Sequence, residues 1–234
     1  MAGRWDTVTT DGGAMRCYVT MPSGTGPFSA VVVIQHAGGV DPFVQSMTDR
    51  IAEAGFVGCS PDLYHRDDPN CSDDALTRMS RLRDANIVPD VNAAIGHLTT
   101  LPEVQADRIG ITGFCMGGRV AYLMAAHNAD LKAAVVFYGG NIMVPWGEGP
   151  APFELSERIQ GPVLGLFGEE DGNPNPADVA KLDAELTRLG RAHEFHSYPG
   201  AGHAFMNEDR PSYRPEAAQD AWAKCVAWFE RHLK

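Results

Sequence analysis

Short apolar runs alternate with longer amphipathic stretches along the chain, and this alternation is the feature that most restricts its fold. The clearest run is AVVVI at residues 30–34, a series rich in β-branched side chains between Pro27 and Gly38. Such a run is typical of a strand that is buried on both faces of a parallel sheet. Residues 42–54 then have the pattern of a helix, which Gly55 ends.

The same alternation continues toward the C-terminus. Further strands are predicted at residues 56–59, 108–112, 133–138, 162–167 and 193–198. Further helices are predicted at residues 86–100, 117–126, 176–189 and 215–233. Strands that alternate with helices indicate a mostly parallel, twisted sheet with helices on both faces. We therefore expect a single α/β domain over residues 1–234, with a short antiparallel edge from the first 22 residues and a polar loop at 63–73.

Composition and charge argue against several classes of protein. Of the 234 residues, 44% are hydrophobic and 21% are charged, which is ordinary for a globular domain and excludes collagen-like and disordered chains. The net charge of −11 argues against nucleic acid as a partner, because an acidic surface repels phosphate. We find no signal-peptide pattern and no apolar run of membrane-spanning length, so we expect no membrane association and a cytoplasmic protein.

The cysteines and histidines do not suggest a disulfide framework or a metal site. Five cysteines are present, at positions 17, 59, 71, 115 and 225, and no CxxC pair occurs among them. An odd number without such pairs argues against a secreted disulfide scaffold and against a cysteine zinc site. The eight histidines show no ligand spacing. We therefore expect neither a metal nor a cofactor.

One cysteine has surroundings that predict a nucleophile. The segment GFCMGG at residues 113–118 has the form of a nucleophile elbow, with Cys115 in the usual place of serine. It follows a predicted strand and opens a predicted helix, and the tight turn between them explains Gly113 and Gly117. The first helical turn directs free N–H groups and the positive end of the helix dipole at the sulfur, and both favour a thiolate. The alternative is a small buried residue, as most free cysteines are.

An acid and a histidine follow later strands in a recognisable order. Asp171 comes after the strand at 162–167 in the sequence Gly-Glu-Glu-Asp, although a solvated acidic turn is the alternative. His203 comes after the strand at 193–198, between glycine-rich residues of a loop. The order nucleophile, acid, histidine is that of the α/β-hydrolases. We therefore predict that Cys115, Asp171 and His203 form a catalytic triad.

Five stretches of the chain together resemble the dienelactone hydrolase family, and the similarity covers nearly the whole sequence. They are VVVIQHAGGV at 31–40, SPDLYHR at 60–66, GFCMGGRVAY at 113–122, LFGEEDGNP at 166–174 and YPGAGHAF at 198–205. The resemblance implies a cysteine hydrolase that cleaves a small ester or lactone through a thioester acyl-enzyme. It also implies that the backbone N–H groups of Met116 and Ala37 bind the oxyanion. We expect a monomer or a homodimer.

The position before Ala37 departs from the family pattern. Well-known members have a glutamate there that helps to deprotonate the thiol, and this chain has His36. A histidine can be neutral or charged near neutral pH, so it can steady a thiolate or contact the substrate, or it is simply a packed loop residue. Tyr138 and Phe205, with Trp146, are expected as aromatic walls of the pocket, with the core as the alternative.

The arginines that hold a substrate carboxylate in the family are harder to place. One is expected among Arg78, Arg81 and Arg83, and we take Arg81 as the candidate substrate contact, although a solvated helix face is the alternative. Near the second position the chain has Asn207, with Arg210 three residues later. These departures keep two other functions open. One is a general carboxylesterase or thioesterase of the same mechanism, and the other is a non-catalytic binding protein with this fold.

Overall fold

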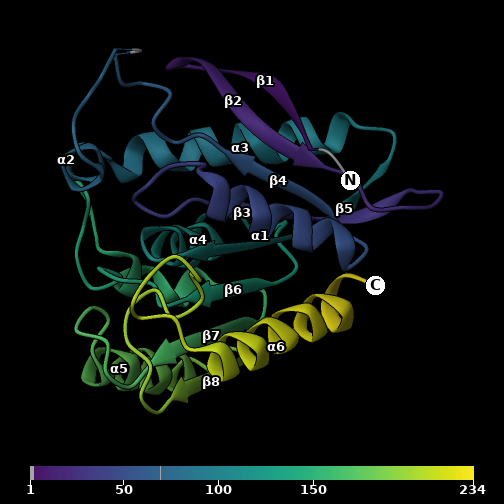
Figure 1. The fold of residues 1–234 in the computed structure, drawn as a ribbon. Helices are drawn as coiled ribbons and strands as arrows, with labels where there is room; N and C mark the ends of the chain where they lie inside the picture. The colour runs from purple at the N-terminus through teal and green to yellow at the C-terminus, as the bar shows by residue number, and fades with distance from the viewer. Residues whose placement is uncertain (1–2, 69) are drawn as a thin grey trace.

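The computed structural model describes residues 3–68 and 70–234, and in them it contains one sheet of eight strands (Figure 1). The strands are β1 (Arg4–Thr10), β2 (Gly13–Thr20), β3 (Phe28–Ile34), β4 (Val57–Pro61), β5 (Val104–Phe114), β6 (Ala134–Phe137), β7 (Val163–Gly168) and β8 (His193–Tyr198). Their order across the sheet is β1-β2-β4-β3-β5-β6-β7-β8. β2 is antiparallel to both of its neighbours. The other six strands, β3 to β8, run parallel to one another. The predicted parallel α/β sheet with an antiparallel edge is therefore confirmed.

Helices cover both faces of the sheet, as Figure 1 shows. They are α1 (Pro42–Glu53), α2 (Ala75–Ser80), α3 (Asp84–Thr100), α4 (Met116–His127), α5 (Pro176–Arg188) and α6 (Pro215–Leu233), with one 3₁₀ helix, η1 (Pro152–Arg158). Val31 and Val33 of β3 pack in the hydrophobic cluster that includes α1 and α6. Val32 and Ile34 pack on the opposite face with α3 and α4, because successive side chains of a strand point to opposite faces.

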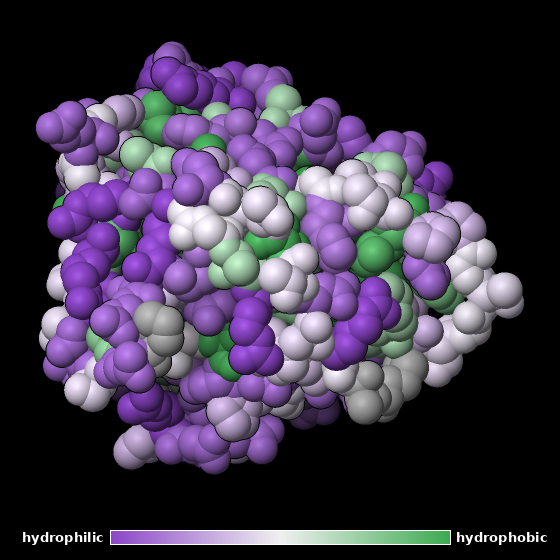
Figure 2. All heavy atoms as spheres, turned by 90° about the horizontal axis from the view of Figure 1, so that it is seen from above, coloured by the Kyte–Doolittle hydropathy of each residue, from purple (hydrophilic) through white to green (hydrophobic). Residues whose placement is uncertain are grey.

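The surface outside this core is mostly polar. Figure 2 shows a face on which hydrophilic residues predominate and hydrophobic ones form small, separate areas. Among the described residues, the large hydrophobic side chains that are exposed are Trp5, Leu76 and Val144. None of the helices formed by the described residues is long and apolar enough to cross a membrane. Exposed large apolar side chains are therefore few among the described residues.

Two short elements lie where the sequence predicts no regular structure. The helix α2 follows the polar loop at 63–73, and the 3₁₀ helix η1 precedes β7. None of the side chains of α2 is buried, so its sequence lacks the apolar periodicity by which helices are recognised. Its first turn is instead stabilised by Asp74, whose carboxylate accepts hydrogen bonds from the backbone N–H groups of Leu76 and Thr77. α2 lies at the left edge of Figure 1.

Candidate active site

Cys115 lies on a strained turn between β5 and α4. Its backbone φ is 60° and its ψ is −121°, a conformation that non-glycine residues rarely adopt. The turn brings backbone into close contact: a Cβ atom at Gly113 would lie 2.2 Å from the carbonyl oxygen of Gly117. A Cβ atom at Gly117 would lie 2.4 Å from the carbonyl oxygen of Ile34. Glycine is therefore required at both flanking positions, and strain of this kind is typical of functional sites.

Asp171 and His203 form a hydrogen-bonded pair beyond the ends of β7 and β8. The Nδ1 atom of His203 lies 2.8 Å from Oδ2 of Asp171, whose side chain is 1% exposed. The other carboxylate oxygen, Oδ1, accepts a hydrogen bond of 2.8 Å from the backbone N–H of Asn173. Both oxygens of the buried carboxylate thus have a partner, and the orientation of Asp171 toward His203 is determined from two sides.

Three effects act on the pKa of His203. Burial lowers this pKa, but hydrogen bonds with Asp171 and Cys115 and the negative charges of both groups outweigh it and raise the pKa to about 10. Cys115 is thus near enough to His203 to affect its imidazole, and both residues line one cavity. The arrangement can therefore hold an imidazolium next to a thiolate.

A cavity of about 720 Å³ opens over Cys115. Cys115, His203, His36, Ala37 and Tyr138 line it, so five of the residues selected from the sequence meet there. Its remaining wall comes from the loop after β3, the starts of α1 and α2 and the loop after β8, and includes Gly38, Phe43, Asp74, Ala75, Leu76, Asn207 and Arg210. A cavity of this size fits a small molecule.

Met116 and Ala37, the two residues expected to supply oxyanion N–H groups, lie next to Cys115 in the chain and in the wall of its cavity, respectively. Met116 is the first residue of α4, and the N–H groups of a first helical turn have no partner within the helix. Ala37 follows β3 and lines the cavity. Tyr64 connects the two residues, since its hydroxyl donates a hydrogen bond of 2.9 Å to the carbonyl oxygen of Ala37 and lies 3.7 Å from the sulfur of Met116.

The loop that carries Tyr64 is fixed by buried charges. The Nε2 atom of His65 lies 3.0 Å from Oδ2 of Asp90 on α3, and both side chains are at most 3% exposed. Arg66 adds two hydrogen bonds to the same carboxylate, of 3.1 and 2.7 Å. A buried carboxylate with three donors is well satisfied, so this loop has one defined position against α3.

His36 belongs to a second histidine–aspartate pair. Its Nε2 atom lies 2.8 Å from Oδ2 of Asp41, and its ring packs edge-on against Phe43. Oδ1 of Asp41 accepts a hydrogen bond of 3.1 Å from the N–H of Val44 and so begins α1. Burial raises the pKa of Asp41, but the hydrogen bonds from His36 and Val44 outweigh it and lower that pKa. Asp41 therefore fixes the orientation of the His36 ring at the wall of the cavity.

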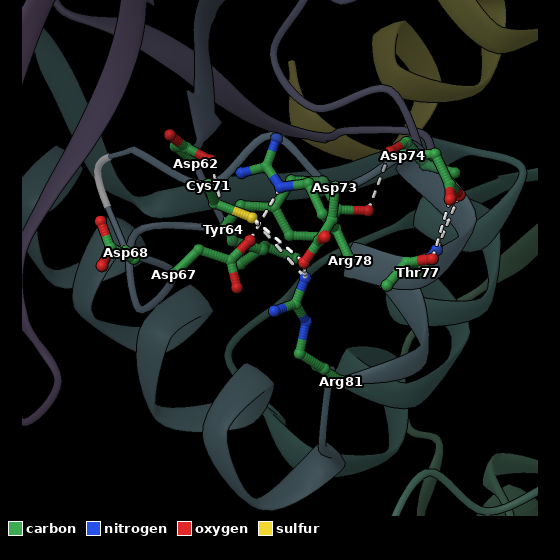
Figure 3. A network of polar contacts seen from close by, with 12 residues as sticks. Asp62, Tyr64, Asp67, Asp68, Cys71, Asp73, Asp74, Thr77, Arg78 and Arg81 are labelled. Carbon is green, nitrogen blue, oxygen red and sulfur yellow. Dashed lines mark hydrogen bonds and ion pairs between the residues drawn. The ribbon is translucent and has the colours of Figure 1, made fainter.

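Two expected contacts with substrate are not supported by the geometry. Arg81 lies outside the cavity, because its guanidinium forms an ion pair with Asp73 and lies 3.6 Å from the sulfur of Cys71 (Figure 3). Phe205 is 0% exposed and packs behind Tyr138, with their ring centroids 5.2 Å apart, so it supports the wall without forming it.

Trp146 is also away from the cavity. Its ring stacks on the guanidinium of the buried Arg119, which forms a bidentate ion pair with Asp84. Of the arginines considered from the sequence, Arg210 is the one that lines the cavity.

Three residues of the site were missed in the sequence. Asp41 stands before Pro42, which is a common helix start, so its capping role was recognisable although its bond to His36 was not. Tyr64 and Asn173 lie within stretches that resemble the family, but neither carries a pattern that indicates its partner. Their contacts with Ala37 and Asp171 become visible only in three dimensions.

Comparison with known proteins agrees with this arrangement. A family model described as the dienelactone hydrolase family matches residues 15–233. A Synechocystis protein, provisionally named carboxymethylenebutenolidase, is 35% identical over 227 residues, which cover 93% of this chain and 92% of that protein. A protein of the same provisional name from Methylorubrum extorquens is 34% identical over 230 residues, which cover 94% and 78% respectively.

A solved structure extends the likeness to three dimensions. The crystal structure of a protein from Klebsiella pneumoniae, provisionally named a dienelactone hydrolase, has a TM-score of 0.90 and 32% sequence identity, over 99% of each chain. The range of the family model includes β3 to β8, the turn at Cys115 and the residues that line the cavity. The chain is therefore a hydrolase that belongs to the dienelactone hydrolase family.

Proposed function

We propose that the protein hydrolyses a small ester or lactone, of the dienelactone type, through a thioester acyl-enzyme on Cys115. One observation carries this proposal: Cys115 lies on a strained turn in the same cavity as His203, whose Nδ1 atom is bound by a buried Asp171. A nucleophile, a base and a group that orients the base are the parts that covalent catalysis requires.

In the first step the thiolate of Cys115 attacks the carbonyl carbon, and a C–S bond forms as the carbonyl oxygen becomes negative. The imidazolium of His203 then donates its Nε2 proton to the departing oxygen, and the C–O bond breaks. A neutral His203 and a thioester remain. Asp171 holds Nδ1 of His203 and so keeps Nε2 directed at the reacting atoms.

In this proposal the N–H groups of Met116 and Ala37 bind the negative oxygen. Such a donor contributes on the order of 3 kcal/mol to transition-state stabilisation in related hydrolases. Tyr64 acts as a positioning residue here, because its hydroxyl holds the carbonyl of Ala37 and thereby the peptide that follows His36.

In the second step water resolves the thioester. Neutral His203 takes a proton from water, the oxygen forms a C–O bond with the carbonyl carbon, and the C–S bond breaks to return the thiolate. Esters and lactones suit this chemistry better than amides, because an amine is a poorer leaving group than the thiolate. No step calls on a metal or a cofactor. His36, held by Asp41, contacts the acyl part of the substrate beside Ala37.

The test compares hydrolysis of a dienelactone and of p-nitrophenyl acetate by the wild type and by Cys115→Ala. Cys71→Ala is the matched control. Among the described cysteines, Cys71 and Cys115 are the two that are not fully buried. We expect Cys115→Ala to lose activity on both substrates and Cys71→Ala to retain it. Intact-mass analysis after a rapid acid quench should detect the added mass of the acyl group on the wild type but not on Cys115→Ala.

The outcomes separate the alternatives. Cleavage of the aryl ester alone, still dependent on Cys115, would support a general carboxylesterase with the same mechanism. Equal inertness of wild type and Cys115→Ala on both substrates would contradict the proposal and favour a binding protein with this fold.

A further inference from the structure

The helix α2 forms part of the cavity although it is not part of the core. Asp74, Ala75 and Leu76 at its start line the cavity together with Cys115 and His203. None of the residues of α2 is buried, whereas the helices that cover the sheet all bury apolar side chains. Met79 of α2 packs against the core but is only partly buried, so hydrophobic contact holds α2 weakly and its position also depends on other contacts.

Polar contacts supply that attachment, and Figure 3 shows them converging on one side of α2. Arg78 forms an ion pair with Asp67, in which Nε lies 2.7 Å from the carboxylate. Arg81 pairs with Asp73 and lies 3.6 Å from the sulfur of Cys71. The arginines that the sequence suggests for substrate binding thus connect α2 to the preceding loop.

One of these contacts reaches the proposed oxyanion site. The guanidinium of Arg78 lies 4.1 Å from the centroid of the Tyr64 ring, and the hydroxyl of the same tyrosine binds the carbonyl oxygen of Ala37. A stacked arginine is held by the ring face as well as by its ion pair. The position of α2 is therefore coupled to the peptide beside Cys115 through one side chain.

Leu76 is the residue of α2 that most needs an explanation. It is 67% exposed, more than the other exposed large hydrophobic side chains of the described residues, yet it lines the cavity. Phe43 and Pro211 line the same cavity and add apolar surface. An exposed leucine at the mouth of a site gains by covering an apolar group, because both then leave water.

The charges at the same mouth do not favour an anionic substrate. Arg210 is the one arginine that lines the cavity, and Asp74 is a carboxylate lining the same cavity. Hydrogen bonds from the backbone and the hydroxyl of Thr77 lower the pKa of Asp74, so the carboxylate is charged at neutral pH. One positive and one negative group leave little net attraction for a carboxylate-bearing substrate.

We propose that α2 is a cap over the cavity, held largely by polar contacts, and that Leu76 is a specificity-determining residue that favours esters or lactones with an apolar substituent. This inference rests on the proposed esterase function of Cys115 and deepens it. Arg78 is a positioning residue in this scheme, because it acts on the substrate through α2.

The test measures discrimination between short and long substrates in Leu76 variants. One series lengthens the acyl chain of p-nitrophenyl esters, and another lengthens the alcohol of acetate esters. We expect Leu76→Asn to reduce the long-to-short ratio of kcat/KM roughly tenfold in one series, since lost apolar contact in a pocket has about this effect. Leu76→Met, which is similar in size and apolar, should keep the ratio. An unchanged ratio in both series for Leu76→Asn would overturn the assignment.

A second set of variants tests the attachment. Arg78→Gln should lower the same ratio, and adding Leu76→Asn to it should lower the ratio little further, because both changes remove one effect. A merely structural role would lower kcat/KM equally for short and long substrates. Arg188→Gln is the matched control, since Arg188 forms an ion pair with Glu185 on α5 and does not line the cavity. Full additivity of the two changes would contradict the coupling.

These outcomes are distinct from failure of the proposed function. If Cys115→Ala retained activity on the short esters, the esterase mechanism would be wrong whatever the Leu76 variants did. If Cys115→Ala is inactive and the Leu76→Asn ratio is unchanged, the mechanism stands and the role of α2 fails.

Discussion

Nε2 of His36 lies 2.8 Å from Oδ2 of Asp41, so a second histidine–aspartate pair faces the cavity that also holds His203. The carboxylate of Asp41 has two tasks, because its other oxygen caps α1. The pair stands where well-known members of the family have a glutamate. The wall of the cavity beside Ala37 thus carries a ring nitrogen that can donate or accept, in place of a fixed negative charge.

Substitutions at this pair should separate its two tasks. Asp41→Asn keeps a good N-cap and should leave the free energy of unfolding nearly unchanged, whereas Asp41→Ala should lower it by about 1 kcal/mol. We expect His36→Gln to lower kcat/KM by up to roughly tenfold, the value of one net hydrogen bond to the substrate. Urea denaturation and steady-state kinetics measure the two effects. Equal loss of stability in both Asp41 variants would show that the cap is unimportant.

The pKa of His203 predicts a basic limit to activity. Because this pKa is raised to about 10, the imidazolium persists through neutral pH and is lost as the pH rises through about 10. kcat/KM for an alkyl ester, whose leaving oxygen needs a proton, should fall there. The raised pKa of His203 also stabilises the folded state. This stabilisation is fully present below the ordinary pKa of histidine and is lost as the pH rises through about 10.

Asp171→Asn tests the cause of this limit. The carboxylate is one of the groups that raise the pKa of His203, so its loss should move the basic limb to lower pH. The measurement is the pH profile of kcat/KM for wild type and variant on the same alkyl ester. A limb that stays in place would mean that a group other than His203 titrates there.

The turn at Cys115 should tolerate no side chain at its flanks. Gly117→Ala places a Cβ 2.4 Å from a backbone carbonyl oxygen, and we expect it to lower the free energy of unfolding by about 3 kcal/mol and to reduce activity. Gly96→Ala, in α3 with open space around the new atom, should instead raise stability by about 1 kcal/mol. Urea denaturation measures the free energy of unfolding of both variants. Similar values for Gly117→Ala and Gly96→Ala would contradict the prediction.

Tyr64 offers a way to weaken the oxyanion site without touching Cys115. Tyr64→Phe keeps the ring under Arg78 and removes the hydroxyl that binds the carbonyl of Ala37. We expect kcat to fall roughly tenfold with little change in KM, because the loosened peptide binds the transition state less well. A rise in KM at constant kcat would place the effect on substrate binding instead.

Most of the predicted elements that the structure confirms bury apolar side chains. The β-branched run of β3 and the amphipathic pattern of α6 mark the side chains that enter the core. α2 and η1 escaped prediction, and α2 shows the reason most clearly, since it has no buried residue. A helix held by a cap and by ion pairs leaves little trace in hydrophobic periodicity.

The sequence by itself determined the α/β alternation, the glycine-flanked turn at Cys115 and the order of Asp171 and His203, because each depends on neighbours along the chain. Only the tertiary structure decided which charged groups meet. It pairs Arg81 with Asp73 outside the cavity, and it brings Tyr64 to Ala37. Distance and burial in the folded chain decide which charged groups pair. The sequence alone offers several carboxylates as possible partners for each arginine and does not distinguish between them.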